Sequence, residues 1–358
     1  MTPEQIFEKS IATHFPAGIF HPIENSPNFL ICKWLDNSVA TFFNHNTEYL
    51  KIAKPHFYLI HSDSINGCAF DNKGYNFIGI TKGLIDYSSF TFRNILRDNN
   101  FLPEALEKNE NQQAVIINNE DFTGWRTFCQ NNNLSFDALD YTPNNSDRRI
   151  IGEALSQYFI FFSLLHEVGH LRQRNPNYLL ELDTLTNRTK KDYQLHQVLE
   201  MDADKFAVNQ LANHLITAFK NRELPINQPY MPFFKNQSLV VRYSIFMLFF
   251  MFYFFSHNNN FAKYFFDYPH PHPALRFSYS SRLLIECFYD NSFMSKDELL
   301  QCYKLSISDF GNLVQRIYPH AEWKKFFELI KDTDLDNHYH SLKATALGIN
   351  NLNGDYSL

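Results

Sequence analysis

Two histidines and a glutamate at a fixed spacing are the residues of this sequence best suited to chemistry. They lie in the string His166-Glu167-Val168-Gly169-His170, an H-E-x-x-H pattern. On a helix, residues four positions apart share one face, so both imidazoles can bind a single metal ion while Glu167 reaches a water molecule on it. Zinc suits this pattern because it needs only three protein ligands in a catalytic site and lowers the pKa of bound water to about 7. The pattern predicts attack of water on a carbonyl group, with Glu167 as general base.

The residues around this string favour that interpretation over an ordinary amphipathic helix with two surface histidines. Most of them are apolar, and polar groups buried among apolar ones are costly unless something binds them. We expect a buried helix over about residues 148–174, which Ser146 or Asp147 would cap and Pro176 would end. Gly169 lowers helix propensity by about 1 kcal/mol relative to Ala. A neighbouring strand or helix is therefore expected to approach its backbone closely.

A second helical pattern carries the remaining ligand candidates. It begins near Asp192 and places Glu200 and Asp204 one turn apart on the same face. Glu200 follows His170 by 30 residues, which leaves room for the first helix to end and for the chain to turn back. We predict Glu200 as the third zinc ligand. Asp204 would accept the free N–H of a ligand imidazole and fix its orientation.

Two alternatives stay open for this second helix. Together with Asp202, the two acidic residues also fit a solvated stripe, because charged runs usually face water. His196, one turn before Glu200, is a rival for the third ligand position.

Histidines alternate with prolines further along the chain, in Pro269-His270-Pro271-His272-Pro273. The prolines favour an extended segment that leads into a helix starting near residue 274. One interpretation is a rigid turn with incidental histidines. In the other, His270 or His272 reaches over the zinc together with Arg276, either to bind the oxyanion or to order the site through Asp204.

The region before the H-E-x-x-H string has the pattern of a small sheet. Residues 56–61 and 75–81 are rich in β-formers and predict two strands, the second antiparallel and preceded by a turn at Asp71–Gly74. Thr81 is suited to cap the helix that follows, which would end near Arg97.

Composition excludes several classes of function. The 358 residues carry a net charge of −6, so no basic surface for nucleic acid is indicated. The N-terminus lacks the basic and apolar regions of a secretory signal. The five cysteines are odd in number and form no C-x-x-C pair, which favours free thiols in a reducing compartment; they are Cys32, Cys68, Cys129, Cys287 and Cys302. We therefore expect a cytoplasmic protein.

One apolar segment bears on membrane contact. Residues 243–255 are apolar or aromatic apart from Ser244. A membrane span needs about 20 such residues, so this segment is closer in length to a buried core helix. Membrane insertion or an interfacial helix is the alternative that its aromatic richness leaves open.

Taken together, these motifs resemble gluzincin-type zinc metallopeptidases, most of all the family that includes the heat-shock protease HtpX and the CAAX prenyl proteases. Four elements occur in the family's order: the Asn-Ala-Phe edge strand and T-x-G-L element at 66–70 and 78–84, H-E-x-x-H at 166–170, E-x-x-A-D at 200–204, and H-P…R at His270-Pro271 and Arg276. The resemblance implies a peptide substrate extended along the edge strand, where it would contact Asn66, Cys68, Ala69 and Phe70.

The resemblance covers about residues 56–84 and 150–285. The pair Gly67-Cys68 departs from the edge-strand motif, and the flanking transmembrane helices of the family's integral membrane members are missing. A soluble peptidase, more distantly similar to the phage-exclusion peptidase Lit, fits these departures better.

From these observations we expect a mostly helical α+β protein. Its zincin-like core would have a small antiparallel sheet packed on the H-E-x-x-H helix. Residues 1–285 would form the metallopeptidase domain, with an Asn-rich insertion at 98–147, and residues 286–358 a helical extension. In that extension we expect helices near 296–304 and 322–331, a weakly ordered tail, and solvent-exposed histidines at His320, His338 and His340.

The predicted function is zinc-dependent endopeptidase activity on a protein or peptide substrate. Zn²⁺ would be held by His166, His170 and Glu200, with His270 and Arg276 supporting Glu167 in catalysis. A catalytically inactive zinc-binding sensor is the main alternative, and it would close the site with a fourth protein ligand such as His270 or His272. An aminopeptidase would need an additional acidic group for the substrate's free amine, and the sequence shows no motif for one.

Overall fold

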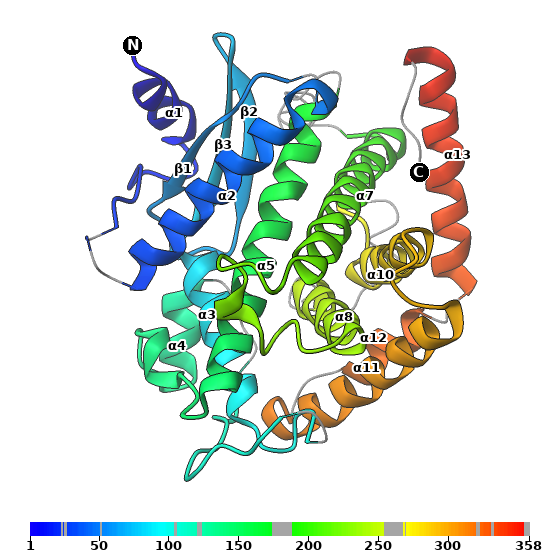
Figure 1. The fold of residues 1–358 in the computed structure, drawn as a ribbon. Helices are drawn as coiled ribbons and strands as arrows, with labels where there is room; N and C mark the ends of the chain where they lie inside the picture. The colour runs from blue at the N-terminus through cyan, green and yellow to red at the C-terminus, as the bar shows by residue number, and fades with distance from the viewer. Residues whose placement is uncertain are drawn as a thin grey trace.

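The computed structural model describes residues 1–22, 24, 27–50, 52–103, 106–119, 124–173, 188–253, 268, 270–319, 323–330 and 333–353. It is mostly helical with one small sheet (Figure 1), so the α+β class is confirmed. The strands are β1 (His56–Ile60), β2 (Gly67–Asn72) and β3 (Tyr75–Thr81). The α-helices are α1 (Pro3–Ile11), α2 (Pro27–Leu50), α3 (Lys82–Arg97), α4 (Trp125–Asn131), α5 (Ser146–Arg172), α7 (Lys190–Lys220), α8 (Gln237–Tyr253), α10 (Pro273–Asp290), α11 (Lys296–Ile317), α12 (Trp323–Ile330) and α13 (Thr333–Asn353).

The sheet is mixed, in the order β1-β3-β2, so the expectation of an antiparallel sheet is wrong for β1. Strands β2 and β3 form a hairpin around Lys73 and Gly74, whose φ angles of 54° and 78° suit a two-residue turn. This hairpin confirms the predicted turn and leaves only the other edge of β3 for β1. Because β1 runs in the same direction as β3, the two pair in parallel.

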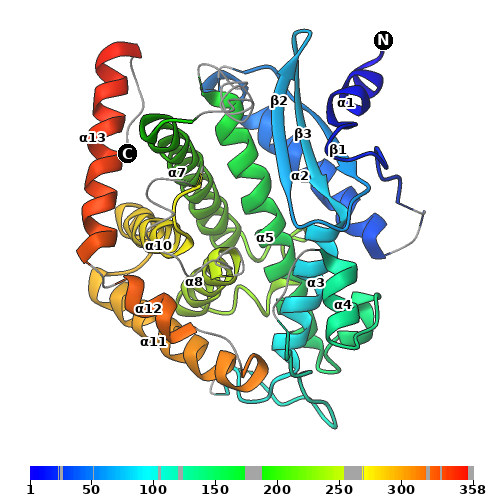
Figure 2. The same ribbon diagram turned by 180° about the vertical axis from the view of Figure 1, so that it is seen from behind.

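The two faces of the sheet are covered by different helices. Ile78 and Ile80 belong to the main core beside α5, whereas Phe77 and Phe70 pack with Phe7 of α1 in a separate small cluster. Side chains alternate between faces along a strand. The main-core face of β2 and β3 is therefore the one turned toward α5 (Figure 2).

The helix starts follow local capping signals. The side chain of Thr81 accepts a hydrogen bond from the backbone N–H of Leu84, which confirms the predicted cap of α3. Helix α5 is capped by Asn145 rather than by Ser146 or Asp147, because the Asn145 side chain accepts from the N–H of Arg148. The proposed stop at residue 176 lies outside the described residues.

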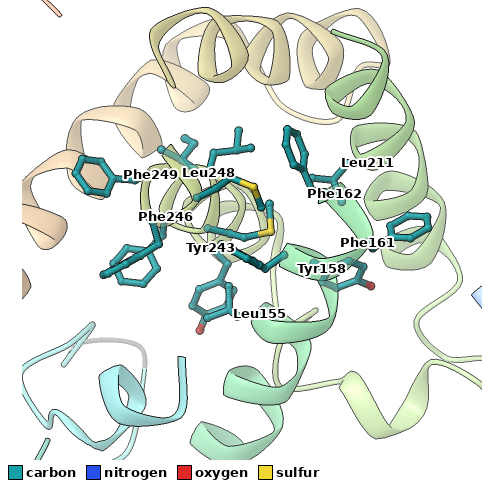
Figure 3. Close-up of a cluster of buried hydrophobic side chains, with 14 of the residues drawn as sticks. Leu155, Tyr158, Phe161, Phe162, Leu211, Tyr243, Phe246, Leu248 and Phe249 are labelled. Carbon is teal, nitrogen blue, oxygen red and sulfur yellow. The ribbon is translucent and has the colours of Figure 1, made fainter. Parts of the chain in front are cut away.

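The hydrophobic core is built around α5 and α8. In α8 every residue from Leu239 to Tyr253 is buried, which confirms a core helix over the described part of 243–255. Figure 3 shows Tyr243 of this helix near Leu155 and Tyr158 of α5, whereas Phe246 and Phe249 lie on the side of α8 away from α5. Within the part of the chain that the structure describes, no helix is long and apolar enough to cross a membrane.

The Asn-rich stretch before α5 is held by one buried arginine. Arg148 is fully buried and its guanidinium donates to backbone carbonyls of five residues in this stretch and the end of α3, namely Leu96, Asp98, Phe101, Leu106 and Glu107. A buried charge is tolerated when such acceptors surround it. The stretch is therefore tied to the core at its junction with α5.

The C-terminal region differs from its expected form. Residues 333–353 form helix α13 instead of a weakly ordered tail, because Leu335, Leu342 and Ala346 give it a buried face. His338 lies on that face and is only 6% exposed, so the expected solvent exposure is wrong for it. The side chain of His340 is 67% exposed, as expected, and His320 is outside the described residues.

Helix α7 approaches the backbone of Gly169 closely, as predicted from a glycine inside a helix. A Cβ atom at Gly169 would lie 2.7 Å from the Cα atom of Ala203, so α5 and α7 touch here backbone to backbone. Gly152 is the matched case on the same helix, because its Cβ atom would come no closer than 3.4 Å to another residue.

We expect Gly169→Ala to lower the free energy of unfolding by about 1–3 kcal/mol, the usual cost of overpacking. Gly152→Ala should leave it unchanged or raise it by up to about 1 kcal/mol, because alanine favours helix and nothing is displaced. Urea denaturation of both variants measures the difference. Equal stability of the two variants would show that the contact with Ala203 is not tight.

Candidate metal centre

Two helices bring three potential ligands together. His166 and His170 lie one turn apart on the face of α5 that is turned toward α7, and Glu200 faces them from α7. The Nε2 atoms of the two histidines are 3.1 Å apart. Oε2 of Glu200 lies 3.4 Å from Nε2 of His166, and Oε1 lies 3.4 Å from Nε2 of His170.

These three separations have the size expected of ligands on one ion. A tetrahedral zinc with bonds of about 2.0–2.1 Å holds its ligand atoms about 3.3 Å apart. The group of His166, His170 and Glu200 could therefore hold a metal ion. Among the described residues, no fourth His, Cys, Asp or Glu joins it.

Each ligand histidine has a partner for its second ring nitrogen. Oδ1 of Asp204 lies 2.9 Å from Nδ1 of His166, the contact expected of a carboxylate that orients a ligand. Nδ1 of His170 lies 3.4 Å from Oε1 of Gln173. Gln173 also donates from Nε2 to the carbonyl of Leu199, which joins the end of α5 to α7. Apart from its place directly after α5, no local feature of the sequence marks Gln173 as part of the site.

Arg276 of α10 is bound to Asp204. Its Nε and Nη2 atoms each lie 2.7 Å from a carboxylate oxygen of Asp204, and Nη1 is 3.6 Å from Oε2 of Glu200. Of the two roles expected for Arg276, this arrangement corresponds to ordering the site through Asp204. The alternative interpretation as a solvated acidic stripe is wrong for Glu200 and Asp204, because their side chains are only 4% and 0% exposed.

Positively charged neighbours keep the buried carboxylates of the site ionised. Burial opposes ionisation of Glu200 and Asp204, but the histidines around Glu200 and the guanidinium of Arg276 beside Asp204 outweigh it and lower the pKa of both carboxyl groups. Burial also opposes the charged form of His166, yet its contacts with both carboxylates raise its pKa to about 10. Two buried carboxylates thus stay ionised beside Arg276 and His166.

Glu167 lies between the ligand group and the edge strand. A Cβ atom at Gly67 of β2 would come within 2.8 Å of Oε1 of Glu167, so a larger residue there would require this carboxylate to move. Burial raises the pKa of Glu167, and the nearby imidazoles act in the opposite direction. In the sequence, Gly67 is distinguished only by its departure from the edge-strand motif. A glycine inside a strand is itself a signal of close approach by another group.

The His-Pro segment contributes one histidine to the site. Nδ1 of His270 lies 3.1 Å from Oε2 of Glu200, and its side chain is 55% exposed. His272 instead is buried, and its Nδ1 accepts from the N–H of Ala274 as the cap of α10. The centre of the His196 ring lies 5.5 Å from that of the His270 ring, with the two rings tilted by 43°, but His196 is outside the ligand group. Among these histidines, His270 therefore lies nearest the ligands.

A pocket of about 530 Å³ opens beside the three ligands. Asn66, Cys68 and Ala69 line it from the side of the sheet, and Glu167 of α5 and His270 line it as well. Its apolar wall comes from α3, α5 and α8, with Leu84, Phe162, Met251 and Phe252. Phe70 does not line the pocket. Its side chain packs with Phe7 of α1 in the small cluster on the other side of the sheet, and its expected contact with a substrate stays a prediction.

Comparison of the chain with family models, with curated proteins and with solved structures gives no match in any of the three. The resemblance to the family of HtpX and the CAAX prenyl proteases, and the more distant one to Lit, therefore remain predictions based on motifs.

We expect Glu200→Gln to weaken zinc binding at least about tenfold, because a neutral amide replaces the anionic ligand. The equivalent change in His196, His196→Gln, should leave the affinity within about twofold, because His196 lies outside the ligand group. Competition with a chromogenic chelator gives both dissociation constants. A larger loss of zinc affinity in His196→Gln than in Glu200→Gln would identify His196 as the third ligand.

Asp204→Asn should weaken zinc binding about 10–100-fold, as is usual for loss of a carboxylate that orients a ligand imidazole. It should also lower stability, because the buried guanidinium of Arg276 loses its ionic partner. The control is Asp290→Asn on α10, where the carboxyl group is exposed and belongs neither to the pocket nor to the ligand group. Chelator competition and urea denaturation are the measurements, and equal effects of both substitutions would contradict the assignment.

Proposed function

We propose that this protein is a zinc-dependent endopeptidase. The observation that carries the proposal is the triangle of two imidazole nitrogens and one carboxylate at tetrahedral spacing, open on one side to a pocket bounded by an edge strand. Catalytic zinc sites have three protein ligands and keep one position for water or substrate, whereas structural sites are closed by four.

The donor set supports zinc as the metal. Two imidazoles and one carboxylate in tetrahedral arrangement are typical of catalytic zinc, whereas magnesium and calcium prefer six or more oxygen ligands. Zinc bound there would supply a Lewis acid that polarises the substrate carbonyl and lowers the pKa of bound water to about 7.

The residues around the ligands have the positions that peptide hydrolysis requires. Glu167, held against Gly67, would take a proton from the attacking water and pass it to the leaving amine nitrogen. His270 lines the pocket with Nδ1 directed at Glu200, so its Nε2 atom is the candidate to donate to the carbonyl oxygen of the substrate. Asp204 and Arg276 would keep His166 and Glu200 in orientation.

The shape of the site supports an extended peptide as substrate. Strand β2 is at the edge of the sheet, and no described strand pairs with its outer side. A peptide can add to such an edge through main-chain hydrogen bonds. The acidic residues that line the pocket are Glu167 and Glu200, and both already have roles. No further described acid in the pocket is left to bind a free amine, which favours cleavage within a chain over aminopeptidase activity.

The alternative of an inactive zinc-binding sensor has less support. It needs a fourth protein ligand, but His272 caps α10 and His270 lies outside the ligand group. We also propose a cytoplasmic location, because the four cysteines whose side chains the structure describes are all free thiols.

We expect Glu167→Gln to retain one zinc per chain and the native fold but to lose nearly all hydrolysis, because the amide cannot accept the proton. Metal analysis, circular dichroism and a comparison of new N-termini in a proteome digested by wild type and variant are the measurements. The paired variant Glu153→Gln, on the same helix and away from the pocket, should cleave like wild type. Undiminished cleavage by Glu167→Gln would rule out the mechanism, and zinc binding without cleavage by wild type would favour the sensor.

A further inference from the structure

A line of hydrogen bonds joins the C-terminal helix to the segment that carries His270. Nε2 of His338 on α13 lies 2.6 Å from Oε1 of Gln197 on α7. Nε2 of Gln197 donates to the backbone carbonyl of Tyr268 at 2.8 Å. Both side chains are buried, and Gln197 is 0% exposed. Helix α13 packs along α7 at this point (Figure 2).

The same segment is attached to α7 a second time, at the ligand group. His270 follows Tyr268 by two residues, and its Nδ1 atom is 3.1 Å from Oε2 of Glu200. Gln197 and Glu200 are one helical turn apart and thus on the same face of α7. The segment therefore contacts α7 at two adjacent points, one at Tyr268 and one at His270.

The backbone carbonyl of Tyr268 determines which end of the Gln197 amide faces His338. A carbonyl oxygen can only accept a hydrogen bond, so Gln197 must turn its NH₂ group to Tyr268 and its oxygen to His338. Nε2 of His338 must then donate. Burial lowers the pKa of His338 to about 4, and Lys190 acts in the same direction. The ring is neutral at pH 7, and the contact selects the tautomer with its proton on Nε2.

We propose that Gln197 and His338 are positioning residues, which hold the backbone of Tyr268 so that His270, two residues further on, stays against Glu200 at the mouth of the pocket. Helix α13 then forms part of the architecture of the site. Any effect of this positioning on catalysis rests on the proposed function. The position of His270 itself can be measured without metal or substrate.

The test is the rate at which diethyl pyrocarbonate modifies His270 in the metal-free protein, followed by mass spectrometry of its peptide. We expect the modification rate to rise about fivefold in His338→Leu and in Gln197→Met, because each variant removes a hydrogen bond of this link. His338→Gln should behave like wild type, because its amide can donate from nearly the same place. His340→Ala, on the exposed side of α13, is the matched control.

Folding is controlled within the same experiment. His272 is buried as the cap of α10, so it should stay unmodified in every folded variant. If His338→Leu unfolds by this criterion, the comparison of Gln197→Met with wild type decides. Equal modification of His270 in wild type and all folded variants would overturn the proposal.

A double-mutant cycle separates positioning from general destabilisation. His338→Leu should weaken zinc binding about fivefold in the wild-type background and have no effect when His270 is replaced by alanine, because the link then has nothing to position. An equal loss in both backgrounds would show a merely structural role. Failure of wild type to bind zinc would refute the proposed function, while the modification rates would still decide the positioning.

Discussion

A single buried carboxylate joins the three helices that form the site. Asp204 of α7 contacts His166 of α5 on one side and binds Arg276 of α10 on the other. A fully buried charge is costly unless it is paired and hydrogen-bonded. The folded state therefore needs α5, α7 and α10 in their observed places, and the same contacts orient the imidazole of His166 toward the ligand group. Stability and metal binding depend here on the same side chain.

The distance between α5 and α7 is set by the smallest residues at their contact. Gly169 faces Ala203 with no room for a further carbon atom, and this close approach lets Glu200 reach both histidines. The large side chains lie elsewhere, where α8 fills the centre of the molecule with aromatic rings (Figure 3). Phe249 contacts Phe277 of α10 and Phe310 of α11. Many of the chain's aromatic side chains thus pack in the core around α8.

The site draws on distant parts of the chain. Gly67 of the edge strand lies against Glu167, and His338 near the C-terminus reaches the His270 segment through Gln197. The C-terminal helices also contribute Phe310 and Leu342 to the same core as α8. A boundary near residue 285 therefore does not separate the residues around the site from those that support them.

Local patterns in the sequence determined the parts of this site that depend on helical period, capping and turn chemistry. His166 and His170 share a face, Glu200 and Asp204 share another, Thr81 caps α3, and the turn at Lys73 and Gly74 follows from residues a few positions apart.

Only the tertiary structure decided which of several chemically similar residues meet. It paired β1 with β3, turned Phe70 away from the pocket, placed His270 rather than His272 near the ligands, and buried His338. Each of these depends on contacts between segments far apart in the chain. Because such contacts leave no local period or motif, the sequence alone could not distinguish the alternatives.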